Sequence, residues 1–264
     1  MTNLLNSRKA VNSDIPDIPR KQSCSARGFL ETCISDEDSS RRRFLQLAIG
    51  GTLTSLVTVA GKEFAMPHPV RAQSKLSPDP ALQELMDGNR RFASGRLTAP
   101  EQDLAILKQN TIEKQEPFAA LLSCADSRVP VEMVFDQSIG HIFVTRIAGN
   151  FVTPEIIASL EYGVAVLGTK VILVMGHSGC GAVKGTIQAK EVPGQISALF
   201  PHIQPAVDQA GPSLEAATKA NAKIQAALLR EASTVVSSFM KEGKLKVVAG
   251  YYDIASGAVS MLNQ

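Results

Sequence analysis

Apolar residues from about position 115 onward come in short runs separated by longer helical patterns. The runs at 117–124, 141–148 and 170–176 are nearly continuous in apolar residues and short, which is typical of strands buried on both faces. A closing strand pair is expected at 244–253 and 258–262. Strands that alternate with helices predict an α/β fold with a mostly parallel sheet flanked by helices.

The first helix of this domain is expected at 79–95, with Asp79 as its cap and Pro80 in its first turn. A second helix is expected at 101–110. The first pattern is recognised by apolar residues at helical spacing, namely Leu82, Leu85 and Met86.

Two later segments also have helical patterns. The segment 153–168 begins with Thr153 as a cap and Pro154 in the first turn, and Gly168 stands near its end. The segment 194–240 is expected to be mostly helical. Both helical segments lie between predicted strands, as the α/β pattern requires.

The first 72 residues are predicted to form an N-terminal extension that precedes the folded domain. Residues 1–40 are polar and without periodicity, so they cannot bury enough apolar surface to offset the entropy of ordering. The string Ser40-Arg41-Arg42-Arg43-Phe44-Leu45 then precedes a short apolar stretch rich in Gly and Thr, and it resembles a bacterial twin-arginine export signal.

Cleavage is expected after Ala72, within the segment Val70-Arg71-Ala72-Gln73, which offers a small-residue cleavage site. The sequence thus predicts an extension with an export signal at 1–72 and a single catalytic domain at 73–264. An uncleaved membrane anchor is the alternative, although the apolar stretch is short for a span. Export implies contact with the export machinery and a bacterial periplasm, with a thylakoid lumen, the cell exterior or a membrane-anchored location as alternatives.

Charge and composition narrow the function classes. A formal net charge of +2 and the absence of Trp favour neither nucleic acid binding nor base stacking. Four cysteines are too few for a disulfide scaffold in 264 residues. Cleavage would remove Cys24 and Cys33, so Cys124 and Cys180 carry the remaining thiol chemistry.

Both of these cysteines follow predicted strands. Cys124 closes the strand at 117–124, whereas His177 and Cys180 follow the strand at 170–176, at the sheet edge where α/β proteins place their sites. His-x-x-Cys spacing places an imidazole and a thiolate one helical turn apart. Neighbouring glycines would let the backbone pass close to a ligand, at Gly176, Gly179 and Gly181.

Two sulfurs and one nitrogen suit zinc, and three protein ligands leave the open fourth position of a catalytic site. Two other interpretations stay open. A cysteine at a strand end is often a small buried hydrophobe. A cysteine near a histidine can also be a nucleophile pair, as in thiol hydrolases.

Asp126 and Arg128 follow Cys124 at alternating positions. A carboxylate two residues beyond a zinc ligand can reach the fourth position of the metal and block it. Arg128 can hold Asp126 away by a bidentate, charge-assisted pair. The alternative from spacing alone is a structural ion pair or cap.

These residues resemble the signature of the β-class carbonic anhydrases. The pattern Cys124-Ala-Asp126-Ser-Arg128 is followed by His177-Ser-Gly-Cys180, at an interval of 177 − 124 = 53 residues. The resemblance implies a zinc ion, one per chain, bound by Cys124, His177 and Cys180. It implies that Asp126 and Arg128 form a gating and orienting dyad, with Asp126 as a fourth ligand in a closed state. It also implies an α/β domain that dimerises, with active sites near the subunit boundary.

The local sequence is similar to the plant-like subgroup of that family. Gln115, in Gln115-Glu116-Pro117, stands where the subgroup keeps a substrate-binding glutamine. Phe143 and Tyr162 match positions that line its apolar substrate pocket. Ala148 stands where plant members carry a valine, so this pocket is expected to differ slightly in shape.

The implied reaction is the reversible hydration of carbon dioxide to bicarbonate and a proton by a zinc-bound hydroxide. Because two thiolates cancel the formal charge of zinc, activity is expected to rise with pH above neutral. One alternative is a carbon disulfide or carbonyl sulfide hydrolase on the same scaffold. Another is a zinc-containing bicarbonate sensor without turnover, which would not need the carboxylate of Asp126.

Overall fold

The computed structural model describes residues 75–99 and 115–263. The expected helix at 101–110 and the N-terminal extension at 1–72 lie outside these residues. In the described part, no helix has both the length and the apolar character needed to cross a membrane.

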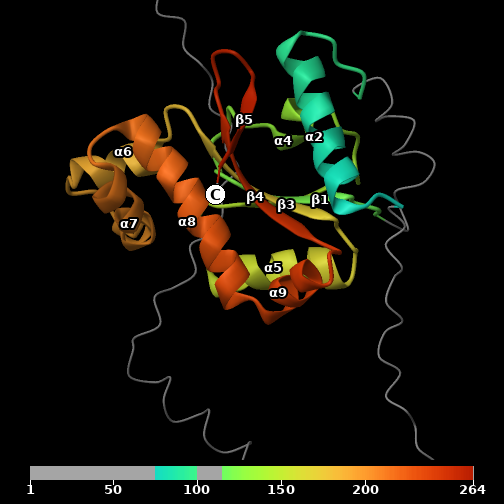
Figure 1. Ribbon diagram of the computed structural model, residues 1–264. Helices are drawn as coiled ribbons and strands as arrows, with labels where there is room; N and C mark the ends of the chain where they lie inside the picture. The colour runs from blue at the N-terminus through green and yellow to red at the C-terminus, as the bar shows by residue number, and fades with distance from the viewer. Residues whose placement is uncertain (1–74, 100–114, 264) are drawn as a thin grey trace, which may run out of the picture. The chain divides into compact units, whose positions relative to one another are not determined.

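The described residues form a five-stranded sheet with the order β2-β1-β3-β4-β5 (Figure 1). The first four strands run parallel, whereas β5 pairs antiparallel with β4, so the predicted mostly parallel sheet with a closing strand pair is confirmed. The strand bounds are β1 Ala119–Ser123, β2 Ile142–Arg146, β3 Val171–His177, β4 Lys246–Tyr252 and β5 Val259–Leu262.

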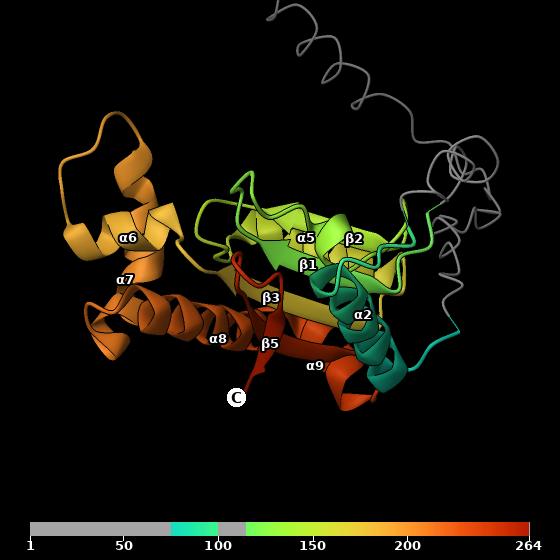
Figure 2. The ribbon, with the colours of Figure 1, turned by 90° about the horizontal axis from the view of Figure 1, so that it is seen from above.

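Helices cover both faces of this sheet (Figures 1 and 2). One face carries α2 (Pro78–Ala93) and α4 (Val131–Val134). The other face carries α5 (Pro154–Ala165), α8 (Leu214–Ala232) and α9 (Thr234–Lys241). Beyond one end of the sheet, beside α8, lie α6 (Gly181–Gln188), the short 3-10 helix η1 (Ile196–Leu199) and α7 (Phe200–Ala210). The segment 194–240 is thus mostly helical, as predicted.

Successive side chains along the central strands point to opposite faces of the sheet, so each strand contributes apolar residues to both cores. In β1, Leu121 faces the α2 layer and Leu122 faces the α5 and α8 layer; in β3, Leu173 and Val174 divide in the same way. All four side chains are fully buried. Continuous apolar runs are therefore required here, because each successive side chain enters one of two cores.

The observed first residues of α5 and α2 can be compared with the two predicted N-terminal caps. Thr153 caps α5 as predicted, since its side chain accepts a hydrogen bond from Ile156 N and Pro154 is the first helical residue. The predicted start of the first helix is wrong by two residues, because α2 begins at Pro78 after Ser77. A proline is well suited to the first helical position, where no N–H donor is needed.

The parallel register brings two strand ends to one edge. Ser123, the last residue of β1, is aligned with Met175 in β3, so Cys124 and His177 follow at the same carboxyl edge. The strand β3 continues two residues further along β4, where His177 is aligned with Tyr252. The two candidate metal-binding segments therefore meet because of the strand register.

Candidate metal centre

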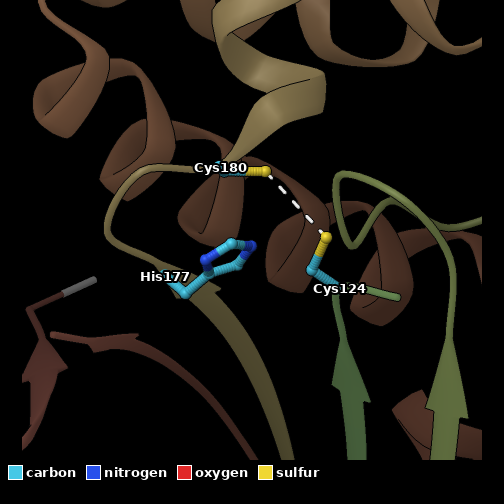
Figure 3. A group of neighbouring side chains, drawn as sticks. All are labelled: Cys124, His177 and Cys180. Carbon is cyan, nitrogen blue, oxygen red and sulfur yellow. Dashed lines mark hydrogen bonds between the residues drawn. The ribbon is translucent and has the colours of Figure 1, made fainter. Parts of the chain in front are cut away.

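Three side chains converge at this edge, from the end of β1, the end of β3 and the start of α6 (Figure 3). The Sγ atoms of Cys124 and Cys180 are 4.0 Å apart, and no disulfide joins them. The donor atoms of these cysteines and of His177 all lie within 4.8 Å of one another, and all three residues are buried. This cluster can hold a metal ion.

The segment from His177 to Cys180 is a strand, a tight turn and a helix start, which differs from the predicted helical turn. His177 ends β3, Gly179 adopts the left-handed region with φ of +69°, and Cys180 is the residue before α6. The turn therefore brings the imidazole and the thiol together. A residue with a Cβ atom would be strained at Gly179.

The missing side chain at Gly176 leaves room for the helix α8 to approach β3, and not for a ligand. A Cβ atom at Gly176 would lie 2.8 Å from the side-chain methyl of Thr218 and 3.1 Å from the Thr218 carbonyl oxygen. The expectation that this glycine makes room for a ligand is therefore wrong. It lets α8 pack directly against the strand that carries His177.

The imidazole of His177 is oriented for a metal. Its Nδ1 atom lies 3.0 Å from the Ser178 carbonyl oxygen, which can only accept, so Nδ1 carries the proton. Its Nε2 atom is buried and has no hydrogen-bond partner among the described residues. Buried polar atoms normally have a partner, so this lone pair is consistent with a metal ligand.

The sulfur spacing agrees with zinc. Tetrahedral bonds of about 2.3 Å from zinc to sulfur separate two sulfurs by about 3.8 Å. The observed separation between Cys124 and Cys180 is 4.0 Å. With the free Nε2 atom of His177, the donor set fits a zinc ion with an open fourth position.

One hydrogen bond between the thiols of Cys124 and Cys180 shifts the pKa values of both groups. With Cys180 as the hydrogen-bond donor, the pKa of Cys124 falls to about 4 despite the opposing effect of burial. The same hydrogen bond and burial raise the pKa of Cys180. Two adjacent thiolates would repel each other, so the hydrogen-bonded pair favours keeping one proton between the two sulfurs.

Asp126 lies beside the cluster in a bidentate pair with Arg128. The guanidinium donates from Nε to Oδ1 at 3.0 Å and from Nη2 to Oδ2 at 2.8 Å, while the Arg128 backbone N–H donates to Oδ1 at 2.9 Å. These bonds hold the pKa of Asp126 well below its usual range. Oδ2 remains 3.9 Å from His177 Nε2.

The Asp126–Arg128 pair contributes orientation more than stability. Exposed ion pairs stabilise proteins by only about 0.2–1 kcal/mol, and the Arg128 side chain is 54% exposed. Arg128 Nη2 also lies 3.3 Å from the Gly179 carbonyl oxygen, to which it donates. One guanidinium thus links the carboxylate to the turn between His177 and Cys180.

Two residues at this site were not singled out in the sequence. Arg146, at the end of β2, donates to the carbonyl oxygens of Cys124, Asp126 and Val129 at 3.0, 2.7 and 2.9 Å. Gly149 N donates to Cys124 Sγ at 3.3 Å. The available signal was a charged residue within the predicted strand at 141–148, two residues before its end. The hydrogen-bond partners of Arg146 and Gly149 lie in segments distant in the sequence, so these contacts could not be predicted from the local pattern.

The predicted substrate-binding residues lie in different places. Ala148 directly precedes Gly149 and is next to the cluster. Gln115 is exposed before the amino end of β1, so the length of that strand, about 16 Å, separates it from Cys124. Phe143 is aligned with Ala120, well before the carboxyl edge.

Phe143 and Tyr162 form a pair of their own. Their ring centroids are 6.2 Å apart, and Tyr162 is 47% exposed on α5. One chain therefore does not bring Gln115 or this aromatic pair to the Cys–His–Cys cluster.

Comparison with known proteins identifies one family. A family model described as carbonic anhydrase matches residues 119–259. A carbonic anhydrase of Mycolicibacterium smegmatis is 32% identical over 196 residues, which cover 70% of this chain and 93% of that protein.

Solved structures agree with this fold. The β-carbonic anhydrase of Coccomyxa in complex with acetazolamide is 26% identical, with a TM-score of 0.55 over 69% of this chain and 86% of that one. One of the tetrameric β-carbonic anhydrases of Sordaria macrospora, 21% identical, shows the same fold, with a TM-score of 0.56 over 70% and 98% of the two chains.

The shared proton predicts how metal binding depends on proton release. At about pH 6.5, where a zinc-bound water would still be mostly neutral, zinc should displace only the proton shared by the two sulfurs, so binding should release about one proton per chain. Isothermal titration calorimetry in buffers of different ionisation enthalpy measures this number. Release of about two protons by the unaltered chain would contradict the shared-proton arrangement.

Proposed function

This chain belongs to the β class of the carbonic anhydrase family and is an enzyme of that family, a lyase, and we propose that it hydrates carbon dioxide reversibly at the Cys–His–Cys cluster. The observation that carries the proposal is the buried Cys124, His177 and Cys180 cluster with a restrained carboxylate beside it. Zinc held there would supply a Lewis acid that lowers the pKa of water, so that a nucleophile exists near neutral pH.

Asp126 would orient the attacking water. Because Arg128 engages both carboxylate oxygens, Asp126 stays ionised and is kept from the metal position. A lone pair of Oδ2 can accept a hydrogen bond from the attacking oxygen, whose own lone pair then points at the carbon of carbon dioxide. The exposed Arg128 side chain keeps this geometry while water and bicarbonate exchange.

We further infer that a second copy of the chain completes the substrate pocket. Gln115, Phe143 and Tyr162 lie away from the cluster within one chain, although the plant-like pattern assigns them to the pocket. A dimer with its active sites near the subunit boundary would resolve this difference. The tetrameric state of the Sordaria macrospora relatives supports an oligomer, and assignment to the plant-like subgroup is part of the same proposal.

The N-terminal extension is proposed to direct export. The twin-arginine-like string at 40–45 precedes an apolar stretch, and a cleavage pattern ends at Ala72. Export would divide the chain at about this residue into the extension and the catalytic domain 73–264. The bacterial periplasm is the proposed location.

The Asp126→Asn variant tests the catalytic role. Asparagine keeps the shape of the side chain but accepts the hydrogen bond less well and loses the charge that pairs with Arg128. Carbon dioxide hydration, measured by stopped flow, should fall by about 100-fold or more while bound zinc remains at one per chain. The same change on an exposed carboxylate, Glu132→Gln, should leave the rate unchanged. An unchanged rate in Asp126→Asn would contradict the proposed function of this carboxylate.

Mixed oligomers test whether Gln115 acts across the subunit boundary. A dimer of two Asp126→Asn chains has no intact active site, and neither has a dimer of two Gln115→Ala chains. If Gln115 serves the partner's site, dimers of one chain of each kind regain one intact site. Co-expression should then restore about a quarter of the wild-type activity. No recovery in proven mixed dimers would place Gln115 in the site of its own chain or outside the site.

A reporter fusion tests export. Residues 1–72 fused to a reporter that functions only after folded export should place it in the periplasm of a bacterium with the twin-arginine pathway. Changing both Arg41→Lys and Arg42→Lys should abolish export, whereas Lys9→Arg should not. Equal export by the double variant would contradict the twin-arginine assignment.

A further inference from the structure

A polar stripe crosses the buried face of α8. Thr218, Asn221 and Gln225 are at most 2% exposed and follow one another at helical spacing. Their neighbours on this face are apolar, namely Ala217, Ala222, Ala226 and Leu229. Burying a side-chain amide costs free energy unless its hydrogen bonds are made. The partners of Asn221 and Gln225 therefore indicate what these residues do.

Both amides bind the loop that follows β2. Asn221 Nδ2 donates to the Gly149 carbonyl oxygen at 2.8 Å. Gln225 Oε1 accepts from Val152 N at 2.9 Å, and Gln225 Nε2 lies 3.4 Å from Asn221 Oδ1. Gln225 thus orients the amide of Asn221, and Asn221 in turn holds Gly149.

Gly149 is the residue that reaches the metal cluster. Its N–H donates to Cys124 Sγ at 3.3 Å, with φ of +90°. A Cβ atom at this position would lie 2.6 Å from Ile203 Cδ1, so the loop is pressed against α7. The only side chain that holds the Gly149 carbonyl in the described hydrogen bonds is Asn221.

We infer that Asn221 is a positioning residue for the metal centre, acting through Gly149 on the sulfur of Cys124. The N–H and the carbonyl of Gly149 belong to successive peptide units joined at one Cα atom. By holding the carbonyl, Asn221 restricts rotation at this Cα atom and so helps to keep the N–H directed at the sulfur. An N–H···S bond withdraws electron density from a thiolate, so the bound metal remains a stronger Lewis acid. This inference rests on the proposed function of the cluster as a zinc site.

A hydrogen bond to a sulfur ligand has a larger effect on Lewis acidity in a zinc site that has two thiolates. Two sulfur ligands donate more charge to zinc than imidazoles do and weaken it as a Lewis acid. In the described hydrogen bonds, Cys124 receives a backbone N–H bond at its sulfur from Gly149. Asn221 lies 72 residues from Gly149 in the sequence, so a helix from the far end of the chain would tune the ligand.

The test compares two buried, nearly isosteric substitutions on α8. Asn221→Leu removes the hydrogen bond to Gly149. Thr218→Val removes a hydroxyl whose hydrogen bond goes to Leu214 in the same helix and keeps the methyl contact with Gly176. Zinc affinity is measured by competition with a chelator, and each protein is also loaded with cobalt(II) for absorption spectroscopy.

Asn221→Leu should lose about tenfold or more in zinc affinity. Its sulfur-to-cobalt charge-transfer band should move to longer wavelength, because a sulfur without its hydrogen bond releases an electron more easily. Thr218→Val should match the unaltered chain in both measurements. If Asn221→Leu does not fold, Asn221→Ala tests the same bond with a smaller side chain.

Two results would overturn the inference while leaving the zinc site intact. One is an unshifted band and unchanged affinity in the Asn221 variant. The other is an equal change in Thr218→Val, which would indicate general loosening of α8. Failure of the unaltered chain to bind cobalt through its two cysteines would instead overturn the proposed metal site itself, and the two failures are therefore distinguishable.

Discussion

The buried approach of two sulfurs is the constraint on which the rest of the site depends. Cys124 and Cys180 are buried with their sulfurs 4.0 Å apart, beside an imidazole nitrogen that has no hydrogen-bond partner among the described residues. Two thiolates cannot both be charged there without a cation, because their repulsion is poorly screened. A zinc ion bound there would remove that repulsion and take up the lone pair of His177. The same parallel register that builds the core brings these groups together.

The surrounding polar residues fix what the metal alone would leave adjustable. Arg146 holds three carbonyl oxygens of the segment that carries Cys124 and Asp126. Arg128 holds the carboxylate of Asp126 in a bidentate pair, with Oδ2 3.9 Å from His177 Nε2. The helix α8 contacts the strand that carries His177, through Thr218 at Gly176, and the loop after β2 that donates to Cys124, through Asn221 at Gly149. Catalysis by positioned groups requires this kind of support.

Much of this arrangement could be predicted from local sequence, and the remainder depends on distant contacts. Continuous apolar runs predicted the central strands, since each run must fill two cores. Strand-end positions placed Cys124 and His177 at one edge. Local pattern could not show that Asn221 holds Gly149, because 72 residues separate them, and a buried asparagine on a helix has no distinctive spacing. His-x-x-Cys spacing fits both a helical turn and the tight turn at Gly179, so the spacing alone does not distinguish the two geometries.

The most direct test of the account is stopped-flow carbon dioxide hydration by the purified catalytic domain, over about pH 6.5 to 9, with zinc assayed on the same sample. One zinc per chain and a rate that rises with pH above neutral are expected, because two thiolates weaken zinc as a Lewis acid. A zinc-loaded protein without hydration activity at any pH would contradict the proposed reaction. A maximal rate near pH 6 would contradict the proposed ligand set.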